Sequence, residues 1–282
     1  MLIFLPGAHA AARGAGVRVE ARGGAMVDKD ETGGASGAGN ADYQWAKFDS
    51  EAYFQHYYGE PHPDDDLVIR VAVEALKGAL PTDEKLDIVD VGTGPNLIPF
   101  FCALPRARRL TAWEYAETNV AWLKEELSRD AMRPQWQHFW GVTRDAYGPE
   151  WQLPDNPIPA LREMCVVTQG SIFDLPRQSW DAATMFFCAE SITGRQDEFE
   201  AACAAYARSV RKGGTLAAAF LVRSEGYVVA DRPFPVLKLS PETIEGVFRH
   251  HASNVRAELI GIVDREIRSG YSGFIFLTGT AD

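Results

Sequence analysis

Residues 86–119 read LDIVDVGTGPNLIPFFCALPRARRLTAWEYAETN. A mostly apolar run, Leu86–Val91, ends in the glycine turn Gly92-Thr93-Gly94-Pro95, and a second apolar run, Leu110–Trp113, ends in Glu114. A glycine turn lets the backbone approach a ligand closely, because glycine has no Cβ. An acid at the tip of the next strand can accept hydrogen bonds from a ribose diol. The stretch therefore predicts a site for a nucleoside cofactor.

The spacing within this turn distinguishes between cofactors. The dinucleotide fingerprint needs a third glycine where this chain has Leu97, and no G-K-S/T run follows Gly92 as a phosphate loop requires. A turn that cradles no phosphate but still meets an adenosine is what S-adenosylmethionine needs. Together with Glu114 the turn predicts S-adenosylmethionine. A NAD-dependent enzyme and a ligand-free Rossmann-like turn are the weaker alternatives.

Composition restricts the partners. The 282 residues suffice for one large domain or two small ones, and the net charge of −11 opposes binding to a nucleic-acid backbone. No run approaches the roughly 18 apolar residues of a membrane span, and Met1–Pro6 is a poor signal peptide because no basic residue precedes it. The four cysteines form no C-x-x-C pair and the histidines show no ligand spacing. We therefore expect a cytoplasmic monomer or homodimer that binds no metal, no nucleic acid and no membrane.

The chain is expected to have two parts. Residues 1–40 are rich in Gly and Ala and poor in large apolar residues, which predicts disorder. The folded domain is expected over 41–282, beginning near Tyr43 with a cluster of aromatic residues in 41–63. At helical spacing these aromatics predict either a helix packed on the core by one face or an aromatic lid over a small-molecule pocket.

Beyond the cluster a helix is expected over Asp64–Leu80, and then strands and helices alternate. The predicted strands are Leu86–Val91, Leu110–Glu114, Met164–Thr168, Ala182–Phe187, Leu216–Leu221, Leu259–Asp264 and Phe274–Thr278. The predicted helices are Leu97–Leu104, Thr118–Arg129, Asp197–Val210 and Pro241–His251, with a turn at Gly213-Gly214. This alternation predicts an α/β fold with a parallel sheet covered on both faces. Residues 130–163 interrupt it and are expected to form an insertion or a long loop, more readily a surface elaboration than a part of the substrate site.

The pattern resembles the class I S-adenosylmethionine-dependent methyltransferases and, more narrowly, the nicotinamide, phenylethanolamine and thioether/amine methyltransferase family. The matching segments, in order, are the aromatic opening Phe48–Tyr58, the loop Asp90–Pro95, Glu114-Tyr115 with Asn119, Phe187–Glu190, and Lys212–Gly214, with the family's insertion at 130–163. The resemblance implies a Rossmann-like fold with a seven-stranded, mostly parallel sheet. It also implies S-adenosylmethionine as cofactor, S-adenosylhomocysteine as product, and no metal.

By this resemblance, Glu114 would bind the ribose, Tyr115 would stack on the adenine, and Tyr53 with its neighbouring tyrosines would close over the methionine end. Ser171 stands where many relatives have an acid at the adenine. The implied cofactor contacts are Tyr53, Tyr57, Tyr58, Asp90, Gly92, Thr93, Gly94, Pro95, Asn96, Glu114, Tyr115, Asn119, Ser171, Ile172 and Phe187.

The resemblance also implies an acceptor side. Glu190 follows the fourth strand, where an acid of the amine-methylating relatives faces the substrate nitrogen, so it is expected to hold or take a proton with Tyr53 or His56 as helpers. Its alternative role is that of an acid at a helix start, and His56 is more readily a surface or core residue. Phe220 replaces a second acid, which favours a flat neutral aromatic over a cation. The implied acceptor contacts are Tyr53, Phe187, Glu190, Phe220 and Ser224.

The expected function is methyl transfer from S-adenosylmethionine to a small aromatic or heterocyclic acceptor of the alkaloid or secondary-metabolite kind. The accepting atom is either an amine nitrogen or a nucleophilic ring carbon, such as that of an indole. A non-catalytic module that binds S-adenosylmethionine or S-adenosylhomocysteine is the alternative, because a fold does not prove chemistry.

Overall fold

The computed structural model describes residues 37–79, 85–262 and 268–282. The disorder expected for residues 1–40 therefore lies mostly outside the described residues. Asn40, the last residue of that range, is held in place: its backbone N–H donates to Glu198 Oε2 (2.7 Å) and its side-chain amide donates to the Ile192 carbonyl (3.1 Å). Tertiary hydrogen bonds are thus present before Tyr43.

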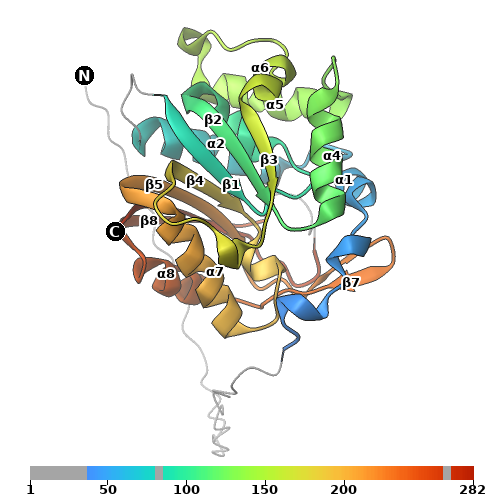
Figure 1. Ribbon diagram of the computed structural model, residues 1–282, viewed down its shortest axis with the longest axis vertical. Helices are drawn as coiled ribbons and strands as arrows, with labels where there is room; N and C mark the ends of the chain where they lie inside the picture. The colour runs from blue at the N-terminus through green and yellow to red at the C-terminus, as the bar shows by residue number, and fades with distance from the viewer. Residues whose placement is uncertain (1–36, 80–84, 263–267) are drawn as a thin grey trace, which may run out of the picture. The chain divides into compact units, whose positions relative to one another are not determined.

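The described residues contain the expected seven-stranded sheet, with order β3-β2-β1-β4-β5-β9-β8 (Figure 1). Its strands are β1 (Leu86–Val91), β2 (Ala107–Glu114), β3 (Cys165–Gln169), β4 (Trp180–Phe186), β5 (Val210–Leu221), β8 (Ala252–Ile260) and β9 (Phe274–Ala281). Pairing is parallel from β3 through β5, and β9 runs antiparallel to both of its neighbours. A separate hairpin joins β6 (Tyr227–Val229) to β7 (Arg232–Phe234). The α/β class and the mostly parallel sheet are confirmed.

Helices cover both faces of this sheet because side chains alternate along the strands. The helices are α1 (Ser50–Tyr58), α2 (Pro63–Ala79), α3 (Ile98–Ala103), α4 (Glu117–Ser128), α5 (Pro134–Tyr147), α6 (Ile158–Met164), α7 (Gln196–Ser209) and α8 (Pro241–Arg249). Ile88 of β1 faces a core shared with α2 to α6, whereas Val89 faces a second core shared with α7 and α8. In Figure 1, α7 and α8 lie in front of the strands and α2 behind them.

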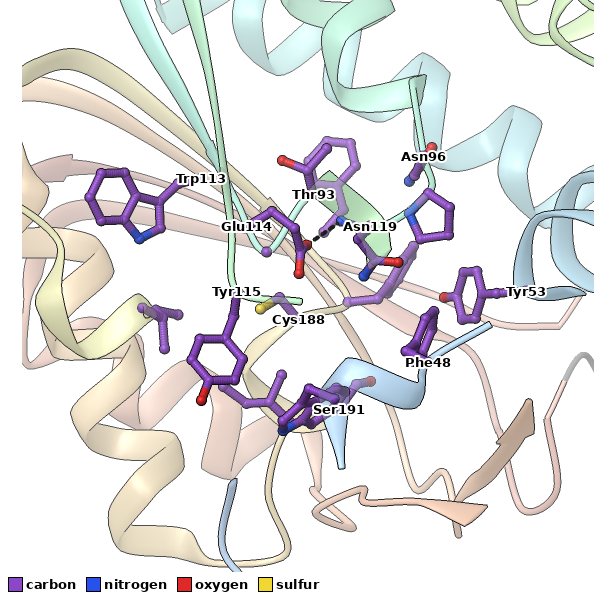
Figure 2. A pocket seen from close by; sticks show the side chains of 18 of the residues that line it. Phe48, Tyr53, Thr93, Asn96, Trp113, Glu114, Tyr115, Asn119, Cys188 and Ser191 are labelled. Atoms are coloured by element: carbon purple, nitrogen blue, oxygen red, sulfur yellow. Dashed lines mark hydrogen bonds between the residues drawn. The ribbon is translucent and has the colours of Figure 1, made fainter. Parts of the chain in front are cut away.

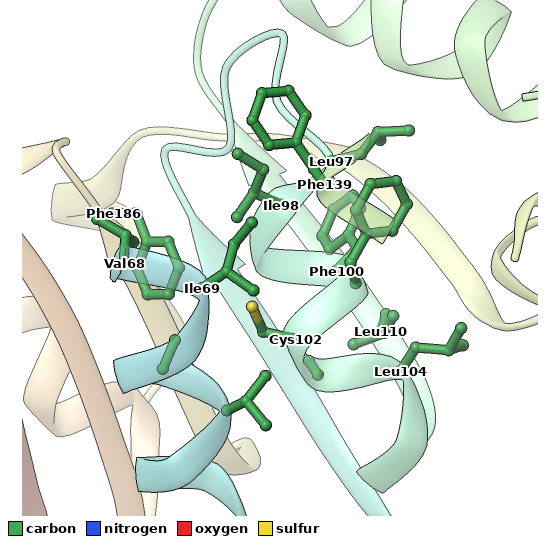
Figure 3. Close-up of a cluster of buried hydrophobic side chains, with 14 of the residues drawn as sticks. Val68, Ile69, Leu97, Ile98, Phe100, Cys102, Leu104, Leu110, Phe139 and Phe186 are labelled. Carbon is green, nitrogen blue, oxygen red and sulfur yellow. The ribbon is translucent and has the colours of Figure 1, made fainter. Parts of the chain in front are cut away.

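The core between α2 and α3 fixes the end of the glycine loop, where α3 begins. Val68 and Ile69 of α2 lie beside Ile98 and Cys102 of α3, and all four side chains are buried (Figure 3). Close packing of this kind resists small displacements. The loop between β1 and α3 is therefore anchored at both ends by buried elements.

Residues 130–163 are neither a long loop nor a surface elaboration. They form α5 and α6, and the side chains of Trp136 and Trp140 are buried in the core. The Trp136 indole N–H donates to Glu126 Oε1 (2.9 Å), the Trp140 indole N–H donates to the Pro154 carbonyl (2.8 Å), and the Tyr147 hydroxyl donates to the Cys102 carbonyl (2.6 Å). The segment completes the core beside α2 and α3, and the polar atoms of these three side chains find hydrogen-bond partners there.

Two further expectations about element boundaries are wrong. The strand predicted at Leu259–Asp264 overlaps β8, which spans Ala252–Ile260 and so begins seven residues before the predicted start; Val263 and Asp264 lie outside the described residues. Its residues are mostly exposed, since it is an edge strand, and a polar edge strand gives no apolar run. The turn predicted at Gly213-Gly214 lies inside β5, where a register shift opposite Trp180 and Ala182 absorbs the positive φ of Gly213.

Candidate cofactor and acceptor site

A cavity opens at the carboxyl ends of β1, β2 and β4. Gly92 follows β1, Glu114 ends β2 and Phe187 follows β4. The strand order reverses between β1 and β4, and ligands bind at such switch points of α/β sheets. The residues lining this first cavity are Asn40, Trp45, Phe48, Tyr53, Tyr58, Gly92, Thr93, Gly94, Pro95, Asn96, Trp113, Glu114, Tyr115, Asn119, Gly170, Ser171, Ile172, Phe186, Phe187, Cys188, Ser191, Ile192, Tyr227 and Arg268. In Figure 2, Glu114 lies between Trp113 on one side and Phe48 and Tyr53 on the other.

The glycine turn forms the floor of the cavity. Gly92 and Gly94 have φ values of +66° and +60°, a region in which side chains other than glycine are strained. A Cβ on Gly92 would lie 2.1 Å from Cys188 Sγ, whereas a Cβ on Gly94 would meet nothing closer than 4.0 Å. Gly92 is therefore required for packing as well as for conformation, and the floor presents bare backbone to a ligand.

Glu114 is fixed by the same turn. Its Oε2 accepts from the Gly94 amide and its Oε1 from the Ala116 amide, both at 2.7 Å. Burial raises the pKa of Glu114, while these amides act in the opposite direction by stabilising the charged form. The carboxyl group is thus held in one orientation with lone pairs left to accept from a diol. Asn119 also lines the cavity and accepts from Ser50 Oγ of α1 (2.6 Å), which joins α1 to α4.

The wall beyond Glu114 suits a flat ring. The Trp113 indole N–H donates to the Ser171 carbonyl (2.9 Å), and Tyr115 is 49% exposed beside it. The Ser171 hydroxyl accepts from the Phe173 amide (3.2 Å) and so caps a 3₁₀ turn that begins at Ile172. An aromatic surface therefore stands on the side of the cavity away from Tyr53.

Helix α1 presents aromatic side chains both to the core and to the first cavity. Phe54 is fully buried in the core, whereas Tyr53 borders the cavity. The hairpin β6–β7 packs on the same segment: the Phe48 and Phe234 rings lie 4.9 Å apart, and the Tyr53 and Tyr227 rings 6.3 Å apart. The α1 segment and the hairpin together cover one side of the first cavity.

A second, larger cavity adjoins the first. The two enclose about 830 and about 1420 Å³, both measured out to their open mouths. The second cavity is lined by Tyr53, Gln55, His56, Tyr57, Tyr58, Gly59, Glu60, His62, Asp65, Phe187, Leu221 and Arg268. Four residues line both cavities, namely Tyr53, Tyr58, Phe187 and Arg268. Phe187 has a φ of +56°, which is strained for an aromatic residue and is typical of functional sites. These four residues form the junction through which a group could pass between the cavities.

Most residues implied by the resemblance come together here. Of the cofactor set, only Tyr57 and Asp90 do not line the first cavity, and Tyr57 lines the second, as does His56. Asp90 is buried beneath the turn, where its Oδ1 accepts from Thr184 Oγ1 (2.6 Å) and burial raises its pKa to about 7. Asp90 therefore supports the turn from below.

Three residues of the expected acceptor set line neither cavity. Phe220 points into the core behind β5, where its ring lies 5.9 Å from that of Phe199. Ser224 is 1% exposed and is also set back from both cavities. The expectation that Phe220 forms a wall of the acceptor site is wrong, because the alternation along β5 turns its side chain to the α7 face and places Leu221 at the second cavity instead.

Glu190 is the third of these residues, and it is fully buried behind the junction. Its Oε1 accepts from the Leu221 amide (2.9 Å), and its Oε2 has no hydrogen-bond partner among the described residues. Burial raises its pKa to about 7, opposed by the Leu221 amide and by Arg268. Glu190 holds the end of β5 that borders the second cavity, so its position fits a residue that orients the site without touching a ligand.

Sequence reasoning missed Arg268, Tyr227 and Asp65. Arg268 and Tyr227 come from the loop before β9 and from a hairpin of three-residue strands, neither of which matches a motif. Asp65 was read as one of three acids that favour a helix start, yet it borders the second cavity, and burial raises its pKa. The three segments are distant along the chain, so only the fold brings them together.

The fold and the first cavity define a class I S-adenosylmethionine-dependent methyltransferase. One solved structure with this fold is magnesium protoporphyrin IX methyltransferase from Synechocystis PCC 6803 with bound SAM, with a TM-score of 0.52, 11% identity, and coverage of 82% of this chain and 90% of that one. A 1,6-didemethyltoxoflavin-N1-methyltransferase from Burkholderia thailandensis matches with a TM-score of 0.49, 13% identity, and coverage of 82% and 86%.

The family is given by the sequence. The profile of the NNMT/PNMT/TEMT family matches residues 37–272, and the chain belongs to that family. Nicotinamide N-methyltransferase of Sus scrofa is 21% identical over 231 residues, which is 76% of this chain and 85% of that protein. The resemblance seen in the sequence is confirmed, and so is S-adenosylmethionine as the cofactor.

Within the described residues, no group of three or more His, Cys, Asp or Glu side chains could hold a metal ion. Among the same residues, no helix has both the length and the apolar character that crossing a membrane would require.

Proposed function

We propose that this methyltransferase moves the methyl group of S-adenosylmethionine from the first cavity to a small aromatic or heterocyclic acceptor in the second. The single observation that carries the proposal is that two cavities share one junction, formed by Tyr53, Tyr58, Phe187 and Arg268. Because Glu114 and the glycine turn border only the first cavity, the cofactor is assigned there. The second cavity is then left for the acceptor.

The lining of the second cavity supports a flat acceptor. Three tyrosine rings and Phe187 border it, and the rings of Tyr53 and Tyr57 lie 4.5 Å apart. Aromatic side chains favour offset or edge contacts with other rings. The pig relative is named for nicotinamide, which is a small ring compound. The acceptors we propose are therefore pyridine- and indole-type rings of the secondary-metabolite kind, methylated on nitrogen or on a ring carbon.

The main task of the protein in this reaction is to hold the cofactor and the acceptor in position. Methyl transfer is an in-line displacement at a sulfonium carbon, so orientation and exclusion of water supply most of the rate. Burial raises the pKa of Tyr53 to about 12, so its hydroxyl stays protonated at the junction. Tyr53 can therefore donate a hydrogen bond to an acceptor. Asp65 also lines the second cavity, and burial raises its pKa to about 8, so in its ionised form it is a base for a proton released on methylation.

The proposed location is the cytoplasm, because the four cysteines are free and at least three are buried as small apolar groups. Methylation of nicotinamide, indole and tryptamine by the purified protein, followed by mass spectrometry and NMR of the products, tests the function. A mass gain of one methylene unit on a ring compound supports it, and NMR distinguishes nitrogen from carbon. Turnover of aliphatic amines alone would contradict the aromatic acceptor.

A further inference from the structure

Arg268 is a buried cation at the junction of the two cavities. It is 7% exposed, and one guanidinium nitrogen donates to Ser191 Oγ (3.1 Å) while another donates to the Tyr53 hydroxyl (3.3 Å). The guanidinium also lies over the rings of Tyr57 and Tyr227, 5.1 and 4.4 Å from their centroids. Two rings and two hydroxyl groups thus fix it in one orientation.

None of these partners carries a negative charge. No carboxylate of the described residues lies within ion-pair distance of Arg268, and Glu190 acts on it only through space. A guanidinium carries five N–H donors, of which two are engaged in these hydrogen bonds. Burying a charge without an ionic partner is costly. The arrangement therefore holds a cation ready for an anion that the described protein does not supply.

Arg268 borders both cavities, and its partners are divided between them: Tyr57 borders only the second cavity, whereas Ser191 and Tyr227 border only the first. The second cavity is the one left for the acceptor, so an anionic group on the acceptor would reach Arg268 from there. The first cavity is assigned to the cofactor by Glu114 and the glycine turn. Resting on the function proposed above, we infer that the acceptor carries a carboxylate or a similar anionic group, and that Arg268 binds it.

This inference changes the class of acceptor. A permanently charged guanidinium repels ammonium and pyridinium groups and pairs with carboxylates in the geometry of its planar fork. Acceptors that are aromatic acids, such as heterocyclic carboxylates, then fit better than amines or amides of the same shape. The anion would also orient the ring, because it would tie one edge of the acceptor to the junction.

Matched ligand pairs test the inference without any substitution. Calorimetry on the complex with S-adenosylhomocysteine would compare nicotinate with nicotinamide, and benzoate with benzamide, near pH 7.5. Each pair differs in charge but hardly in shape. We expect the acids to bind about 10-fold or more tightly than the amides, as a charge-assisted hydrogen bond allows. Equal affinities, or tighter binding of the amides, would overturn the inference whether or not any of these compounds is methylated.

Substitutions then assign the effect to this residue. Arg268→Gln should make the affinities for each acid and its amide equal, while Arg268→Lys should retain part of the preference for the acids. Arg223→Gln is the matched control, because Arg223 is exposed and lines neither cavity. If Arg223→Gln abolished the preference equally, the effect would belong to overall charge and the inference would fail.

The remaining source of a carboxylate is the amino-acid end of the cofactor. Binding of S-adenosylhomocysteine and of 5′-methylthioadenosine, which lacks that end, separates the two sources. We expect Arg268→Gln to change both affinities by the same factor. If it weakens S-adenosylhomocysteine more than 5′-methylthioadenosine, Arg268 serves the cofactor and the inference is overturned, while the proposed methyltransferase function stands. Failure of the whole ring panel to be methylated would instead contradict the proposed function.

Discussion

Alanine substitutions at Gly92 and Gly94 should separate stability from cofactor binding. Both residues have positive φ, so either substitution costs about 1–2 kcal/mol of backbone strain. At Gly92 the new Cβ would also overlap Cys188 Sγ at 2.1 Å and Cys188 Cβ at 2.8 Å. Overpacking of this kind adds about 1–3 kcal/mol. We therefore expect Gly92→Ala to lose roughly 2–5 kcal/mol of unfolding free energy, and Gly94→Ala only about 1–2 kcal/mol.

Urea denaturation of the two variants and the parent protein measures this difference, with S-adenosylhomocysteine calorimetry as the second readout. Gly94→Ala should remain folded and bind the cofactor less tightly, because its added methyl enters open space at the cavity floor. Adding Cys188→Ala to Gly92→Ala should restore part of the lost stability, since it removes the closer of the two overlaps. Equal stability losses for Gly92→Ala and Gly94→Ala would refute the steric reasoning.

Three further outcomes are expected. Glu114→Gln should weaken S-adenosylhomocysteine binding about 10- to 100-fold by calorimetry, because a charged acceptor for the ribose is lost, whereas the exposed neighbour variant Glu117→Gln should bind like the parent. Burial raises the pKa of Glu190 from 4.5 to about 7, so between these pH values the folded state holds a proton that the unfolded state has released. This carboxyl therefore makes the free energy of unfolding fall as the pH rises from about 5 through 7. In urea titrations, the free energy of unfolding of Glu190→Gln should gain roughly 3 kcal/mol relative to the parent between pH 5 and pH 9, and parallel pH curves for the two proteins would count against this reasoning. Trp136→Ala should lose about 3–5 kcal/mol in the same assay without changing the cofactor affinity of the folded protein, and a selective loss of binding would mean that α5 reaches the site.

The first cavity could be predicted because its parts are local in sequence. A strand, a glycine turn and an acid at the next strand tip lie within residues 86–119, and parallel pairing of β1 with β2 necessarily brings the turn beside Glu114. The core helix α5 could not be placed in the same way, since its tryptophans have a helical period but no motif. Its burial depends on the space left beside α2 and α3, which no local pattern encodes.

Predictions failed on the acceptor side because a single residue step decides which face of a strand a side chain occupies. The resemblance put Phe220 in the place of a second acid at the acceptor, whereas alternation along β5 turns Phe220 to the core and Leu221 to the second cavity. Glu190 lies in a 3₁₀ turn rather than a strand, and its carboxyl is buried while its neighbour Ser191 lines the first cavity.

The local charge at the junction is opposite in sign to the net charge of the whole chain. A net charge of −11 suggests a protein that favours cationic ligands, and an acid at Glu190 suggests an amine acceptor. Glu190 accepts a hydrogen bond from the Leu221 amide and lines neither cavity, while Arg268 borders both cavities. The field that an acceptor meets is set by the nearest buried charge rather than by distant surface acids, which water and salt screen. At this junction the nearest buried charge is that of Arg268, so the local charge that an acceptor meets there is positive.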